Sequence, residues 1–134
     1  MSSMGTRVER EVVNALDEAG FRVMRSPSSG SATTRDQPDV LVGRNGKSWA
    51  FEIKYRSGDR VQFSADEIDA LTRFARGFGA APLVIVRWRG DTTLYVYSLP
   101  SIPRTRGGNY ALKRDDTVAA TTTLEEFCER GGTL

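Results

Sequence analysis

The stretch PDVLVGRNGKSWAFEIK, residues 38–54, decides the fold of this chain. Two runs that favour β-structure, residues 39–42 and 48–54, flank Asn45-Gly46. This dipeptide is typical of the tight two-residue turn of a β-hairpin. A two-residue turn also fixes the register, so residues whose numbers add up to 91 should face each other across the two strands.

This register brings three charged side chains together. Asp39 should lie opposite Glu52, and Lys54 should share a face with Glu52 because side chains alternate along a strand. Like charges that face each other are destabilising unless a cation lies between them. Two carboxylates and an ammonium suit a hard divalent cation such as Mg²⁺ beside an attacking water. The alternative is an acidic edge neutralised by nearby Arg and Lys side chains. Three apolar residues point to the opposite face: Trp49, Phe51 and Ile53.

Before the hairpin, the sequence predicts a helix over residues 7–19, because apolar residues recur there at helical spacing. Thr6 and Glu9 have the spacing of a capping box at its start. A strand over residues 21–25 and a polar loop over residues 26–37 should follow.

After the hairpin, Ser64 and Glu67 form a second capping-box pattern and predict a helix that ends near residues 77–79. Residues 82–88 and 92–99 predict a second hairpin. From residue 100 the chain looks irregular and basic, apart from a short helix within residues 123–130. The prediction is an α/β fold with a central mixed sheet flanked by helices, in the order αβββαββ. We expect one domain over residues 1–134, with a core at about residues 5–99 and an extension beyond it.

Composition narrows the chemistry. With 134 residues the chain is about one domain long, and it contains no histidine, which excludes Ser-His-Asp catalysis and His-ligated zinc. The single cysteine, Cys128, cannot form an internal disulfide. We therefore expect a protein of the reducing cytoplasm, without a membrane segment or an organic cofactor. The net charge of +2 is small, so DNA binding must be argued from the placement of basic residues.

Pro38-Asp39 followed by Glu52-Ile53-Lys54 resembles the PD-(D/E)xK nuclease signature. Across residues 5–88 the sequence is similar to the archaeal Holliday junction resolvase family. Six blocks carry that resemblance, in order: Gly5–Glu11, Gly20-Phe21, Arg25–Ser29, Pro38-Asp39, Glu52–Lys54 and Phe74–Gly79.

The resemblance implies a restriction-endonuclease-like core and a homodimer that nicks two opposed strands of four-way DNA junctions with Mg²⁺, for which Mn²⁺ can substitute. It assigns the metal to Glu9, Asp39, Glu52 and the backbone carbonyl of Ile53. It makes Lys54 the catalytic lysine, and it matches Ser29 to a loop serine implicated in cleavage. Arg10 and Arg25 match basic residues near the scissile phosphate, and Phe74 and Phe78 match aromatic residues linked to dimerisation.

Several residues keep a second interpretation. Glu9 could simply complete a capping box, and Phe74 with Phe78 could be core residues. Between Gly30 and Pro38 the loop is longer than the family's shortest versions, so the active serine is one of Ser26, Ser28, Ser29 and Ser31. Each arginine alone could be a solvated surface charge, but together five of them flank the carboxylate face and suit phosphate contact: Arg10, Arg25, Arg35, Arg56 and Arg60.

The sequence leaves three hypotheses about the function. The leading hypothesis is an endonuclease that resolves four-way junctions. The second is another PD-(D/E)xK nuclease, of the restriction or repair type. The third is a junction-binding protein without catalysis, which the intact Asp39, Glu52 and Lys54 disfavour.

Overall fold

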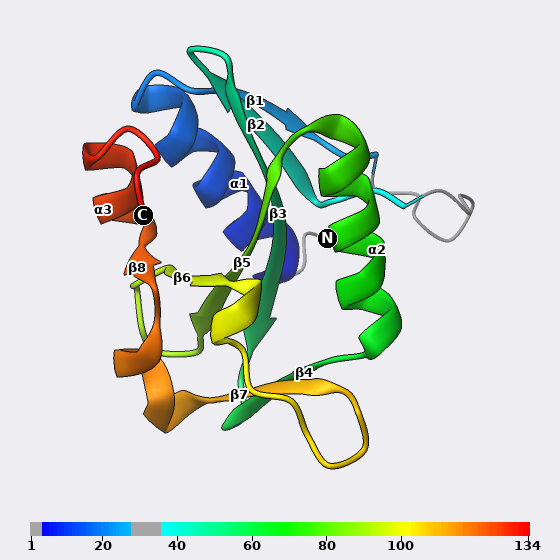
Figure 1. Cartoon of the computed structure of the whole chain (residues 1–134). Helices are drawn as coiled ribbons and strands as arrows, with labels where there is room; N and C mark the ends of the chain where they lie inside the picture. Colours follow the sequence, from blue (N-terminus) through cyan, green and yellow to red (C-terminus); the bar gives the residue numbers. More distant parts are fainter. Residues whose placement is uncertain (1–3, 28–35) are drawn as a thin grey trace.

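The computed structural model describes residues 4–27 and 36–134, without the side chains of residues 117 and 118. A six-stranded sheet runs through the molecule in the order β1-β2-β3-β5-β6-β8, with helices on both faces (Figure 1). β3 and β5 are parallel and the other neighbours are antiparallel, so the sheet is mixed, as predicted. Its strands are β1 (Arg22–Arg25), β2 (Val40–Arg44), β3 (Lys47–Arg56), β5 (Ala81–Trp88), β6 (Tyr95–Ser98) and β8 (Thr122–Thr123).

The central hairpin has the predicted register. β2 and β3 pair from Val40 opposite Phe51 to Arg44 opposite Lys47. Asn45 and Gly46 have φ values of 50° and 81°, the left-handed conformation that a tight hairpin turn needs at both central positions. Local turn chemistry therefore aligns the residues that follow.

Helices cover the two faces of the sheet in unequal number. α1 (Met4–Glu18) and α3 (Leu124–Glu129) lie on one face, and α2 (Ala65–Phe78) lies on the other (Figure 1). On the first face, Phe127 of α3 packs among Phe21, Trp49 and Phe51, with ring centroids 5.4–5.6 Å apart. On the second face, Ile68, Leu71 and Ala75 bury the inner side of α2.

The two predicted capping boxes have opposite outcomes. At α2 the Ser64 hydroxyl accepts the Glu67 N–H at 3.0 Å, and the Glu67 carboxylate accepts the Ser64 N–H at 3.3 Å. Gly79 ends this helix in the left-handed conformation, with φ of 91°. At α1 the prediction is wrong, because the helix already includes Met4 and Thr6 therefore lies inside it.

The prediction of an irregular extension beyond residue 99 is also wrong. β7 (Tyr110–Lys113) pairs with β4 (Arg60–Phe63), a strand that the sequence did not predict, to form a second, two-stranded sheet. β8 extends the main sheet, and α3 packs into the hydrophobic core between this sheet and α1. Two 3₁₀ turns, Leu99–Ser101 and Arg114–Ala119, connect these elements. The core thus draws on residues 100–134 as well. Over the described residues, no helix combines the length and apolar character needed to cross a bilayer.

Candidate active site at the end of the central hairpin

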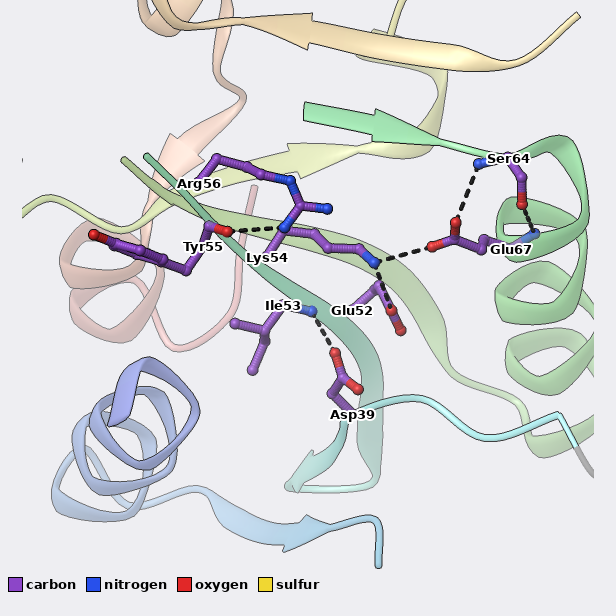
Figure 2. Close-up of polar contacts among 8 residues, drawn as sticks. All are labelled: Asp39, Glu52, Ile53, Lys54, Tyr55, Arg56, Ser64 and Glu67. Carbon is purple, nitrogen blue, oxygen red and sulfur yellow. Dashed lines mark hydrogen bonds and ion pairs between the residues drawn. The ribbon is translucent and has the colours of Figure 1, made fainter. Parts of the chain in front are cut away.

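Asp39 lies where the hairpin ladder ends. β2 begins at Val40, so Asp39 is outside the strand, although its N–H still donates to the Phe51 carbonyl at 3.0 Å. Its carboxylate turns back onto β3 and accepts the Ile53 N–H at 2.7 Å (Figure 2). Asp39 is therefore bonded to β3 through its backbone N–H and its carboxylate, without forming a regular strand pair. This bond fixes the carboxylate next to the β3 residues of the predicted motif.

Lys54 lies between two carboxylates. Its Nζ is 3.0 Å from Oε2 of Glu67 and 3.8 Å from Oε2 of Glu52 (Figure 2). The ammonium is also 5.8 Å from the centre of the Phe63 ring. Glu67 was predicted only as a capping residue, and its role beside Lys54 was missed. The pairing depends on how α2 packs against β3, which no local pattern reveals.

Burial and repulsion act on the two hairpin carboxyls. Burial, followed by the negative charge of Asp39, raises the pKa of Glu52 to about 8. Burial also raises the pKa of Asp39, against the lowering effect of the Ile53 hydrogen bond. Burial acts to raise the pKa of Glu67 too, but the bond and charge of Lys54 outweigh it, so that this pKa is lowered. Ionisation of the hairpin carboxyls is therefore costly, and a bound cation would offset that cost.

Glu9 approaches the hairpin from α1. Its Oε1 accepts a hydrogen bond from Nε of Arg25 in β1 at 2.7 Å, an ion pair that links helix and strand. The capping-box interpretation of Glu9 fails, because Thr6 is not the N-cap. Among residues 4–27 and 36–134, no three carboxylates or thiolates already converge as a metal cage.

One cavity of about 380 Å³ joins these residues. Glu9, Arg25, Asp39, Glu52, Ile53 and Lys54 all line it. Ser26 and Pro27 form part of its rim. The Ser26 N–H donates to the Asp39 carbonyl at 3.0 Å, and the Ser26 hydroxyl donates to the Pro38 carbonyl. The polar loop therefore leaves and rejoins the fold at this cavity. Ser28, Ser29, Ser31 and Arg35 lie outside the described residues.

The remaining predicted DNA contacts are dispersed. Arg10 is exposed on α1 and does not line the cavity. Arg56, at the end of β3, donates from Nη1 to the Tyr55 carbonyl at 2.8 Å. Arg60 is exposed at the start of β4, and it lines a separate hollow of about 400 Å³ with Arg56 and Gln62.

The predicted interface aromatics occupy the outer side of α2. The rings of Phe74 and Phe78 stack with centroids 5.7 Å apart. Phe78 is 55% exposed, so it is not a core residue, whereas Phe74 packs partly against the core. Met24 and Leu41, which face each other across β1 and β2, line a shallow hollow together with Phe74. This α2 face is therefore apolar and accessible.

A larger groove of about 690 Å³ lies between α1, α3 and the loop after β5. Its lining includes four glutamates: Glu11, Glu18, Glu125 and Glu129. The Arg87 guanidinium in it is paired with Glu11 at 2.6 Å. A surface of this charge repels phosphate, so volume alone does not identify the nucleic-acid site.

Comparison with known proteins identifies the family of this chain. The sequence pattern of the archaeal Holliday junction resolvase (Hjc) family matches residues 1–133. The chain belongs to this family. A solved structure of Hjc from Archaeoglobus fulgidus, described as a Holliday junction resolvase from an archaeal hyperthermophile, superposes with a TM-score of 0.81. At 28% identity, this match covers 93% of the chain and 98% of the other protein.

Two curated relatives are both named crossover junction endodeoxyribonuclease Hjc. The relative from Archaeoglobus fulgidus is 41% identical over 88 residues, which are 65% of this chain and 63% of that protein. The match thus spans less than two thirds of that relative's length. The relative from Sulfurisphaera tokodaii is 30% identical over 126 residues, with 93% of this chain and 85% of that protein covered.

Proposed function

We propose that this chain is an endodeoxyribonuclease that resolves four-way DNA junctions by nicking two opposed strands. The observation that carries the proposal is the cavity in which Asp39, Glu52 and Lys54 converge at the end of the central hairpin. Membership of the Hjc family supports the choice of junction DNA as the substrate. A protein that acts on junction DNA would be in the cytoplasm, at the chromosome.

The proposed cofactor is Mg²⁺, with Mn²⁺ as a substitute. Asp39 and Glu52 would hold it, because burial and nearby negative charge raise both pKa values and a cation removes that cost. Mg²⁺ binds through few carboxylates and keeps several waters, so a ready-made protein cage is not required. The family resemblance adds the Ile53 carbonyl as a further oxygen ligand. When bound, the ion polarises the phosphate and lowers the pKa of a coordinated water.

Lys54 is proposed to act on the scissile phosphate. Its ammonium can orient the attacking water or stabilise the negative charge that develops on the phosphate oxygens. Glu67 holds Nζ at 3.0 Å, closer than Glu52, whose Oε2 is 3.8 Å away. The lysine is thereby positioned for the substrate.

Glu9 and Arg25 are proposed to change partners when DNA binds. Their 2.7 Å ion pair occupies both groups in the free protein. Glu9 can offer both of its oxygens to a metal if it gives up Arg25, and the guanidinium thus released can contact a phosphate. A loop hydroxyl, Ser29 by family resemblance, completes the proposed cleavage group.

A homodimer is proposed to supply two sites for paired nicking. Twofold symmetry places the same surface of each protomer against itself. The α2 face with Phe74 and Phe78 suits such an interface, since Phe78 exposes 55% of its surface. Burial of one phenylalanine side chain contributes about 2 kcal/mol.

The test is cleavage of a labelled synthetic four-way junction in Mg²⁺ and in EDTA, beside a linear duplex of the same sequence. We expect paired nicks in the junction, none in EDTA and few in the duplex. Asp39→Asn should abolish nicking, although its amide oxygen can still accept the Ile53 N–H. Equal cutting of the duplex would indicate a restriction or repair nuclease. Junction binding without any nicking would indicate a non-catalytic binding protein.

A further inference from the structure

The small sheet of β4 and β7 presents a basic outer face. Val61, Phe63 and Leu112 point into the core, while Arg60, Gln62 and Lys113 are exposed. The pairing places Arg60 directly opposite Lys113. Two like charges face each other across this pair of strands, an arrangement that destabilises a sheet unless an anion lies over it.

The described residues do not supply that anion. None of the ion pairs within residues 4–27 and 36–134 involves Arg56, Arg60 or Lys113. The hollow that Arg56, Arg60 and Gln62 line, about 400 Å³ in volume, contains no carboxylate among its lining residues. These positive charges are therefore available to an external polyanion.

The two-stranded sheet is held firmly at its charged end. The Arg114 N–H donates to the Asp59 carbonyl at 2.8 Å, so the residues that flank Lys113 and Arg60 are tied together. The Arg114 guanidinium donates to the Arg89 carbonyl, which links β7 to the turn after β5. A surface fixed in this way can accept a rigid ligand without first becoming ordered.

The basic face also lies in line with the candidate active site. Every second side chain of β3 lies on the same face, which therefore carries Glu52, Lys54 and Arg56. Figure 2 shows Lys54 between the carboxylates and Arg56. Four residues of strand separate Glu52 from Arg56 by about 13 Å, which corresponds to about four base pairs of duplex axis. A duplex that enters the cavity at one phosphate can thus reach Arg56 and the small sheet a few base pairs away.

We propose that the outer face of the β4–β7 sheet, with Arg56, Arg60 and Lys113, binds the phosphate backbone of a duplex arm that leaves the junction. The inference rests on the proposed function and adds to it a second contact region, to which the C-terminal third of the chain contributes β7 with Lys113. Such contacts are to phosphate, so they add affinity and orientation without base specificity.

The test is the salt dependence of binding to a labelled four-way junction, measured by fluorescence anisotropy with the full chain. Arg60→Gln with Lys113→Gln removes two charges. We expect at least about fivefold weaker binding at moderate salt, and a log–log salt slope that is shallower by about two. The thermal midpoint should not fall at low salt, because the substitution also removes a repulsion.

Two matched variants identify the cause. Arg22→Gln with Lys47→Gln removes the same charge at the opposite end of the sheet, about 30 Å from Arg56 along β3. This variant should bind as the wild type does. Arg60→Lys with Lys113→Arg alters the same side chains, keeps their charge, and should also bind normally.

Equal binding by the Arg60/Lys113 and Arg22/Lys47 variants would overturn the inference, as would weak binding by the charge-preserving variant. Either result would leave the proposed function standing as long as the wild type nicks junctions in Mg²⁺. A wild type that binds junctions but does not nick them would instead contradict the proposed nuclease, whatever the salt slopes show.

Discussion

Two pairs of strands in this molecule bring like charges together, with opposite sign and opposite exposure. At the end of the β2–β3 hairpin, the carboxyls of Asp39 and Glu52 are mostly buried, and their pKa values rise. On the β4–β7 sheet, Arg60 and Lys113 face each other in solvent. Burial makes charge on the negative pair costly, and a small bound cation would offset that cost. Exposure makes the positive pair inexpensive, so it suits a large, hydrated polyanion.

The largest expected effect tests the negative pair. Glu52→Gln should lower the nicking rate by at least about 100-fold with little change in junction binding, because it removes a proposed metal ligand but hardly changes shape. Single-turnover cleavage in Mg²⁺ measures this rate. Glu18→Gln, an exposed substitution of the same kind on α1, should leave it unchanged. Near-normal nicking by pure Glu52→Gln protein would contradict the catalytic role that distinguishes Asp39 and Glu52 from Arg60 and Lys113.

The next effect tests whether the active protein is a dimer, which would contain two acidic pairs. Phe78→Asp should yield a folded monomer with junction affinity at least about tenfold weaker, because the proposed dimer would engage both halves of the junction. Sedimentation and anisotropy measure these two properties. Leu134→Asp adds the same charge to a residue that is 50% exposed, and should leave the dimer intact. A wild type that sediments as a monomer at micromolar concentration would contradict the two-site arrangement.

A smaller effect tests whether Glu67 holds the Lys54 ammonium away from Glu52. Glu67→Gln removes the ion pair at 3.0 Å but can still accept the Ser64 N–H. Lys54 should then shift toward Glu52, and nicking should slow about fivefold with nearly unchanged thermal stability. Ser64→Ala loses the cap instead, so we expect a lower thermal midpoint with normal nicking. Equal slowing by both variants would show that Glu67 acts only through the helix.

The smallest effect is a pH dependence of stability in EDTA. The folded pKa of Glu52, about 8, lies above the ordinary value of 4.5, so the folded state binds this proton more tightly than the unfolded state. The resulting stabilisation is complete below pH 4.5 and is lost as pH rises through 8. We expect the thermal midpoint of Glu52→Gln to exceed that of the wild type by about 5 °C at pH 8.5, and by little at pH 4.5. A gap that does not change with pH would indicate that Glu52 is ionised in the folded state without cost.

The parts of the molecule that local chemistry determines could be predicted from the sequence. Asn45-Gly46 determines the hairpin register, and Ser64 with Glu67 determines where α2 begins. The first signal, with side-chain alternation along β3, was sufficient to predict that Asp39, Glu52 and Lys54 lie close together, as they do in the cavity. Each signal depends on residues close in the chain, so a pattern records it.

The parts that pair distant residues could not be predicted. β4 and β7 are four residues each and about 50 positions apart, and neither has a turn signal that indicates its partner. The second contact of Glu67 arises only when α2 packs on β3. Thr6 and Glu9 have the spacing of a capping box, yet α1 extends past them to Met4 and Glu9 pairs with Arg25 instead. Long-range packing overrides a local pattern in each case.

The packing of α3 has a consequence for synthesis of the protein. Phe127 fills the space between Phe21 and Trp49, and Gly132 lies so close to Trp49 that an added Cβ atom would be 2.3 Å from the indole. A chain still growing on the ribosome lacks this closure until residue 132 has emerged. Because β2 and β3 rest on that same cluster, the packing beneath the candidate site is complete only after residue 132 has left the ribosome.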